Sequence, residues 1–194
     1  MDSDEERGEE LIARVEEILR IAFDDVAFEL GKGGAKYELI LMPESMRIKL
    51  FSLVYFARLA PASVREHWDI HVGRTASVGF ALRTDDYSIE MEDVAVWFAQ
   101  EGEGIALTLY CEKLLPLLKE DEDRAWWMLS MIVDQALGEI AAMRLIHDFD
   151  VLDAPRAEPP ILLTDLPKAL EEAGLSLDSD AEDYLEHSYL AYER

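Results

Sequence analysis

Three side chains that can bind a metal ion alternate along one predicted strand, at His67, Asp69 and His71. Alternate residues of a strand project from the same face about 6–7 Å apart, so two neighbours could share a zinc ion. One strand does not complete such a site, and a further ligand would have to come from elsewhere, for instance from the stretch 147–150. The pattern suggests a metal-dependent hydrolase as one function, and a polar strand face in solvent as the competing interpretation.

A carboxylate inside a strongly apolar helix is the second candidate for chemistry. Glu139 follows Gly138 in a helix that we predict to begin near Asp121 and to end between Glu139 and Met143. Burial would raise the pKa of Glu139 and suit it to act as a general base. The competing interpretation is structural: Glu139 accepts from a backbone donor or pairs with a cation, and Gly138 permits close packing. We predict no catalytic residue here.

Tyrosines near the C-terminus are the best candidates for contact with a partner. Tyr184, Tyr189 and Tyr192 fall on one side of an acidic helix predicted from about Ser179. Tyrosine combines a large apolar area with a polar tip and is enriched at interfaces. The alternative is that this helix docks on its own domain.

The charge of the chain restricts its partners. The formal net charge is -24, from 42 acidic and 18 basic residues. We expect no direct binding to nucleic-acid phosphates and no binding to anionic membranes, because both would be repelled. The charge fits either an acidic protein that binds or neutralises a basic partner, or a surface that serves solubility alone.

An apolar window, the first ten residues and the cysteine content indicate where the protein is located. The window Trp126–Ile146 is apolar but contains Asp134, Gln135, Glu139 and Arg144, which argues against a membrane span. The acidic start MDSDEERGEE does not look like an export signal. Cys111 is the single cysteine, so no internal disulfide forms, and a reducing cytoplasm is expected. We predict a cytoplasmic location and no cofactor.

The pattern of apolar residues predicts an α+β fold. Helical spacing marks 5–22, about 46–59 and the long helix from Asp121, and strand-like alternation recurs at 26–30, 37–41, 68–72, 78–82, 94–98 and 105–109. Most of these strands lie in hairpins. We therefore predict a two-layer sandwich: a mainly antiparallel sheet of six or more strands, with helices packed mainly on one face. Residues 1–155 would form this domain, and 156–194 an acidic helical appendage.

Several of these features together resemble a group of uncharacterised bacterial cytosolic domains. The shared marks are an alanine-proline pair after a helix, a tryptophan that opens a strand, a Leu-Gly-Glu near the end of a long helix and a later proline; here they stand at Ala60-Pro61, Trp68, Leu137-Gly138-Glu139 and Pro155. The resemblance covers roughly residues 8–165. It implies an α/β sandwich of unknown activity and brings no catalytic residue with it.

The sequence as a whole favours a non-enzymatic cytosolic protein that acts through protein contacts, with a basic protein as the partner that its charge suits best. The alternative class is the metal-dependent hydrolase on the His67/Asp69/His71 face. The sequence does not name the partner.

Overall fold

The computed structural model describes the backbone of residues 2–192, and the side chains of these residues except 2–7, 9, 33 and 188–192. The chain forms two compact units, one ending at Gly73 and one beginning at Arg74. This boundary is not the predicted one at residue 155. Residues 161–175 belong to the core of the second unit, to which they contribute buried leucines at 163, 166, 170 and 175.

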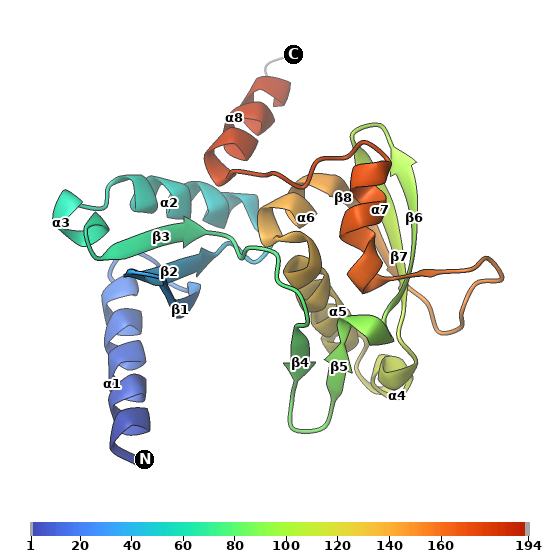
Figure 1. The fold of residues 1–194 in the computed structure, drawn as a ribbon, viewed down its shortest axis with the longest axis horizontal. Coiled ribbons are helices and arrows are strands. Elements are labelled where there is room, and N and C mark those ends of the chain that lie inside the picture. The colour runs from blue at the N-terminus through green and yellow to red at the C-terminus, as the bar shows by residue number, and fades with distance from the viewer. Residues whose placement is uncertain (1, 193–194) are drawn as a thin grey trace. The chain divides into compact units, whose positions relative to one another are not determined.

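The first unit is a three-stranded sheet with helices on one face. Its elements are α1 (Asp2–Leu19), β1 (Ala27–Gly33), β2 (Lys36–Met42), α2 (Arg47–Arg58), α3 (Ala62–Arg65) and β3 (Trp68–Val72). The predicted hairpin is present as β1 and β2, which pair antiparallel (Figure 1). β3 runs parallel to β2, because α2 and α3 carry the chain back across the sheet between them.

A small core joins these elements. Leu19 of α1, Leu41 of β2 and Leu53 of α2 are almost fully buried together. Period two along the strands places Leu39 and Ile70 on the same face as Leu41, where both pack against this core. The helices of the first unit therefore owe their position mainly to a few leucine contacts.

The second unit contains two sheets and most of the buried residues. Its elements are β4 (Ala81–Arg83), β5 (Ser88–Glu90), η1 (Met91–Asp93), β6 (Ala95–Glu101), β7 (Gly104–Tyr110), η2 (Glu112–Leu114), α4 (Leu115–Glu120), α5 (Glu122–Leu137), α6 (Glu139–Leu145), β8 (Ile146–Val151), β9 (Ile161–Leu162), η3 (Leu163–Asp165), α7 (Leu166–Glu172) and α8 (Ala181–Tyr192). β4 and β5 form a hairpin, and the other strands are ordered β8-β7-β6-β9. Figure 1 shows both sheets.

The apolar helix α5 is the centre of the second core. Met128, Leu129 and Ile132 are fully buried and share one cluster with Ile105 and Leu107 of β7. The acidic residue Asp121 caps this helix by accepting from the backbone N–H of Arg124 at 3.1 Å. In the described part of the chain, no helix is both long enough and apolar enough to cross a membrane.

The prediction of a single sheet of six or more strands is wrong, although the structure confirms a mixed α+β fold. In the part of the chain that the structure describes, the strands lie in three sheets of three, two and four strands. Two neighbouring pairs are parallel, β2 with β3 and β7 with β8, because helices lie between their strands in the chain. Alternation shows that a strand has a buried face, but it does not show which strand lies beside it.

The predicted long helix is also interrupted. α5 ends at Leu137 and α6 begins at Glu139, because Gly138 adopts φ 84° and ψ 137°. This conformation is almost restricted to glycine. A Cβ at Gly138 would also lie 3.3 Å from the backbone nitrogen of Ala76. The glycine thus permits both the break and the close approach of residues 74–76.

We predict that Gly138→Ala lowers the free energy of unfolding by about 2–3 kcal/mol, through backbone strain and crowding against Ala76. Gly102→Ala is the matched control, since Gly102 has φ 64° but open space around the added Cβ. It should cost about 1 kcal/mol. Urea denaturation of both variants measures the difference, and equal losses would mean that close packing at Gly138 is unimportant.

Candidate functional site

The predicted metal ligands lie on β3 or next to it. Asp69 and His71 are on the face of β3 opposite Ile70, which packs into the core, and His67 precedes the strand. The carboxylate of Asp69 accepts from the ammonium of Lys36 at 2.9 Å, and this ion pair competes with any metal ion. Among the described residues, no group of three or more histidine, cysteine or acidic side chains is arranged to hold a metal. A metal site on this face stays a prediction.

The predicted partner-binding tyrosines all fall in α8. Tyr184 is only 8% exposed, and its hydroxyl donates to the carbonyl of Met143 at 3.3 Å. Tyr184 therefore docks α8 onto its own unit, which leaves little of its surface for a partner. The side chains of Tyr189 and Tyr192 lie outside the described residues. Their role in binding stays a prediction.

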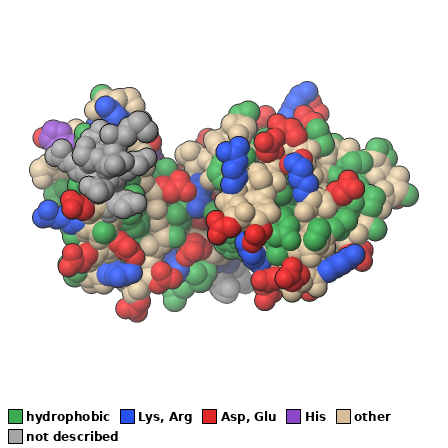
Figure 2. All heavy atoms as spheres, turned by 90° about the horizontal axis from the view of Figure 1, so that it is seen from below, with side chains coloured by type: hydrophobic (Ala, Val, Ile, Leu, Met, Phe, Trp, Pro, Cys, Tyr) green, Lys and Arg blue, Asp and Glu red, His purple; other side chains and the backbone are tan. Residues whose placement is uncertain are grey.

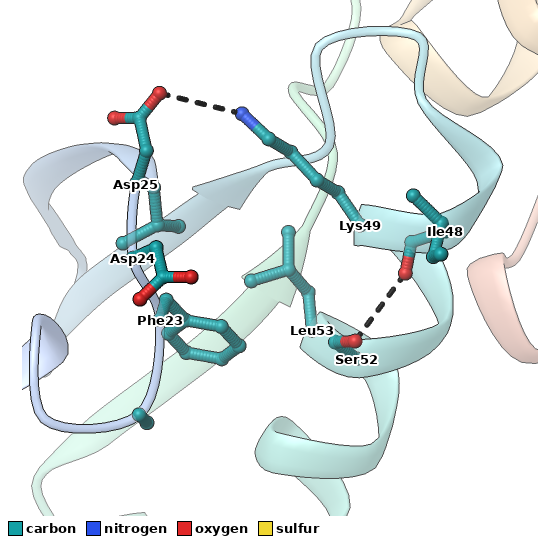
Figure 3. Close-up of a pocket in the computed structure, with 9 residues that line it drawn as sticks. Phe23, Asp24, Asp25, Ile48, Lys49, Ser52 and Leu53 are labelled. Atoms are coloured by element: carbon teal, nitrogen blue, oxygen red, sulfur yellow. Dashed lines mark hydrogen bonds and ion pairs between the residues drawn. The ribbon is translucent and has the colours of Figure 1, made fainter.

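A pocket of about 310 Å³ lies in the first unit, between the segment that follows α1 and the first turns of α2 (Figure 3). Phe23, Val26 and Leu53 give it an apolar wall. Asp24 and Asp25 lie along the loop side, while Lys49 and Ser52 come from α2. The pocket thus combines apolar surface with charged groups at its rim.

The end of α1 shapes the pocket. The backbone N–H groups of Ala22 and Phe23 both donate to the carbonyl of Leu19 at 2.9 Å, so the chain makes one more turn before β1. This turn directs the ring of Phe23 onto Phe56 of α2, with the ring centroids 5.2 Å apart in an edge-to-face arrangement. Asp24 and Asp25 follow at once and are exposed. Local helix-end geometry therefore places the two carboxylates beside an apolar wall.

The cation in the pocket is already paired. The Lys49 ammonium lies 2.5 Å from a carboxylate oxygen of Glu44 and 3.7 Å from one of Asp25. The hydrogen bond to Glu44 is the main cause that raises the pKa of Lys49 above its ordinary value. Glu44 and Ser45 have φ of 51° and 58°, which is unusual for residues other than glycine. A left-handed turn before α2 therefore brings Glu44 to Lys49.

These properties select a class of ligand. Pockets for small molecules commonly span about 300–1,000 Å³, so this pocket is at the lower limit and suits a single side chain. Because Glu44 already pairs with Lys49, the carboxylates of Asp24 and Asp25 favour a cation at the rim. A long basic side chain meets both conditions, with its apolar stem on the wall and its charge outside.

The sequence did not reveal this pocket. Phe23-Asp24-Asp25 reads as a link between a helix and a strand, and Lys49 as a surface position of a helix. The two segments are more than twenty residues apart, and only folding brings them together. The usable signal was a phenylalanine next to two acidic residues, in the short link between the helix predicted at 5–22 and the strand predicted at 26–30.

The second unit buries three polar side chains, Asp134, Gln135 and Glu139, near the break between α5 and α6. The carboxylate of Glu139 is fully buried and accepts from the backbone N–H of Arg74 at 3.2 Å, while the N–H of Glu139 donates to the carbonyl of Arg74 at 2.9 Å. Ser77 binds Gln135 in a similar double contact, through its N–H to the carbonyl at 2.8 Å and its hydroxyl to Oε1 at 2.9 Å. Residues 74–77 thus satisfy backbone groups that the helix ends leave open.

Asp134 lies one turn before the break and is 8% exposed. Burial, and next the charge of Glu139, raise its pKa to about 7, although Arg74 acts in the opposite direction. A carboxylic acid with this pKa can exchange protons near neutral pH. Its neighbour Glu139 is held by the backbone of Arg74, so we interpret the group as structural, in agreement with the backbone-donor interpretation of Glu139.

Comparison of the chain with protein-family models, with curated proteins and with solved structures found no match. The interpretation of the site therefore depends on the geometry and charge of its own residues.

We predict that Asp134→Asn changes how stability depends on pH. The folded-state pKa of about 7 lies above the ordinary value of 3.8, so the folded chain binds more protons between these values and loses stability as pH rises through that window. The variant should match the parent near pH 4 and exceed its free energy of unfolding near pH 8, by at most about 4 kcal/mol. Thermal unfolding across pH measures this.

Asp123→Asn is the control, because Asp123 is exposed on the same helix. It makes the same substitution without altering a buried carboxylate. If the difference between Asp134→Asn and the parent were independent of pH, Asp134 would not be the buried proton-binding group.

Proposed function

We propose that this protein is a non-enzymatic binding protein that holds a basic segment of another protein in the pocket of its first unit. The observation that supports the proposal most is the pairing of an apolar wall with exposed carboxylates. Phe23 and Ile48 offer surface to the methylene stem of a lysine or arginine, and Asp24 and Asp25 offer charge to its end (Figure 3).

The state of Lys49 strengthens the preference for a cation. A free lysine in the pocket would attract an acidic ligand, but the side chain of Lys49 is 21% exposed and its ammonium is held by Glu44. The side chain of Asp25 is 89% exposed, and its carboxylate lies farther from the Lys49 ammonium, at 3.7 Å. A bound basic side chain would therefore find carboxylates that are not fully neutralised.

The charge of the whole chain supports the same class of partner. A net charge of -24 steers basic proteins toward the surface and repels phosphate backbones. On the face that Figure 2 shows, acidic side chains are spread among basic and hydrophobic ones and do not gather in one patch. We infer that the overall charge speeds the encounter, while the pocket supplies the specific contact.

We also propose that the protein acts in the cytosol. One cysteine, buried at position 111, fits a reducing cytosol, where the bacterial domains that the sequence resembles are also expected to act. The alternative of a metal-dependent hydrolase is supported by no further observation on β3. Asp69 is held there by Lys36.

We predict opposite effects of two charge changes in the pocket on binding of the peptide Ac-Leu-Arg-Lys-Leu-NH2, which is too short to form a stable helix. Asp24→Asn should weaken binding about two- to fivefold, and Lys49→Gln should strengthen it by a similar factor, as expected for exposed charge pairs. Calorimetric titration at low salt measures both. Binding should decline strongly at about 1 M salt, where the Debye length falls to about 3 Å.

Asp153→Asn is the control, because it makes the same charge change at an exposed position of the second unit. If it weakened binding as much as Asp24→Asn, only the overall charge would matter, and the pocket would not be the site. Failure of the peptide to bind the parent protein at all would refute the proposal.

A further inference from the structure

α1 carries an exposed apolar row that leads into the pocket. Leu11, Ile18 and Ala22 are separated by steps of seven and four, which place them on one line along a helix. Leu11 is 57% exposed and Ile18 is 56% exposed. Ala22 continues the row past the helix end and lines the pocket itself.

This row is not used by the core of its own unit. Leu19 is only 3% exposed, and Val15 packs beside it against the sheet. The row lies at one margin of the same apolar stripe, where Leu11 and Ile18 stay more than half exposed. Figure 1 shows that the N-terminal part of α1 extends past the edge of the three-stranded sheet. A helix of this kind offers a narrow, unpartnered apolar surface to another chain.

The charge of α1 decides between the possible occupants. Its sequence, DSDEERGEELIARVEEIL, is strongly acidic. Exposed Arg14 lies beside the row, three residues after Leu11 and four before Ile18. Glu10 and Glu17 lie beyond it on the same side, and Glu16 lies beyond the core-facing stripe on the other, so acidic side chains outnumber the basic one around the row. A second copy of α1 would bring the same negative charge, and an anionic membrane would do likewise. A helix with basic residues beside its apolar stripe is complementary.

We propose that the partner segment is a basic amphipathic helix, which lies along Leu11 and Ile18 and places one lysine or arginine side chain in the pocket. The proposal rests on the pocket function given above and adds the conformation of the partner. From Leu11 to Ala22 the row is roughly 16 Å long at 1.5 Å per residue. A partner helix of about three turns, with apolar residues at i, i+3 or i+4, and i+7, would cover it.

The test uses a designed peptide of about 18 residues, five helical turns, that carries leucines on one face and lysines on the other. The double variant Leu11→Ser/Ile18→Ser should bind it at least about tenfold more weakly than the parent, because two apolar contacts are lost. The peptide should gain helical circular dichroism when it binds. The short peptide Ac-Leu-Arg-Lys-Leu-NH2 should bind the double variant and the parent equally.

Ile12→Ser is the matched control, since Ile12 is 50% exposed on the same helix but lies about 100° from Leu11. It should leave the affinity for the long peptide unchanged. The helix proposal is overturned if Ile12→Ser weakens binding as much as the double variant, if the double variant binds like the parent, or if a scrambled peptide of the same composition binds equally well.

A further outcome concerns self-association. If sedimentation showed that the parent protein is a dimer and that Leu11→Ser/Ile18→Ser is a monomer, the row would bind a second copy, and the proposal would be wrong. Failure of the helix proposal leaves the pocket function intact as long as the short peptide still responds to Asp24→Asn. Loss of both responses would refute the pocket function as well.

Discussion

The packing of the α1 end onto α2 is the contact on which the first unit depends. Leu19, Leu41 and Leu53 are its nearly fully buried cluster, and the ring of Phe23 closes that cluster against Phe56. A core of this size contributes only a few side chains at about 1.5–3 kcal/mol each, so each contact is a large share of the stability. The same contact holds Asp24 and Asp25 at the rim of the pocket. Stability and the proposed binding surface are thus linked through Phe23.

The second unit differs from the first because its larger core contains buried polar side chains. Its core is large, and α5 passes through it with Asp134, Gln135 and Glu139 buried near its end. Such groups are costly unless they are hydrogen-bonded. Residues 74–77, the first after the unit boundary, supply partners for Gln135 and Glu139. The hydrogen bonds of Gln135 and Glu139 therefore hold residues 74–77 against α5 and α6, and we assign these buried side chains a structural role.

Some of this could be predicted from the sequence. The hairpin of β1 and β2, the helix in α2 and the buried stripe of α5 all follow from local periodicity, and the structure contains them. The break at Gly138 could not be foreseen, because the residues around it continue the helical pattern and residues 74–76, which pack against the glycine, are distant in the sequence. The division into three sheets depends on which strands become neighbours, and that is decided by helix crossovers and long-range packing. The pocket was missed for the same reason, since Phe23 and Lys49 meet only in the folded chain.

The central claim is that a basic side chain occupies the pocket between Phe23 and α2. The most direct measurement is a nuclear magnetic resonance titration of the whole protein with Ac-Leu-Arg-Lys-Leu-NH2. The account predicts that backbone signals of Phe23, Asp24 and Ser52 shift together and saturably, while those of His71 on the other face of the sheet stay in place. Shifts centred on β3 around His67 and His71, or shifts spread evenly over acidic positions of both units, would contradict it.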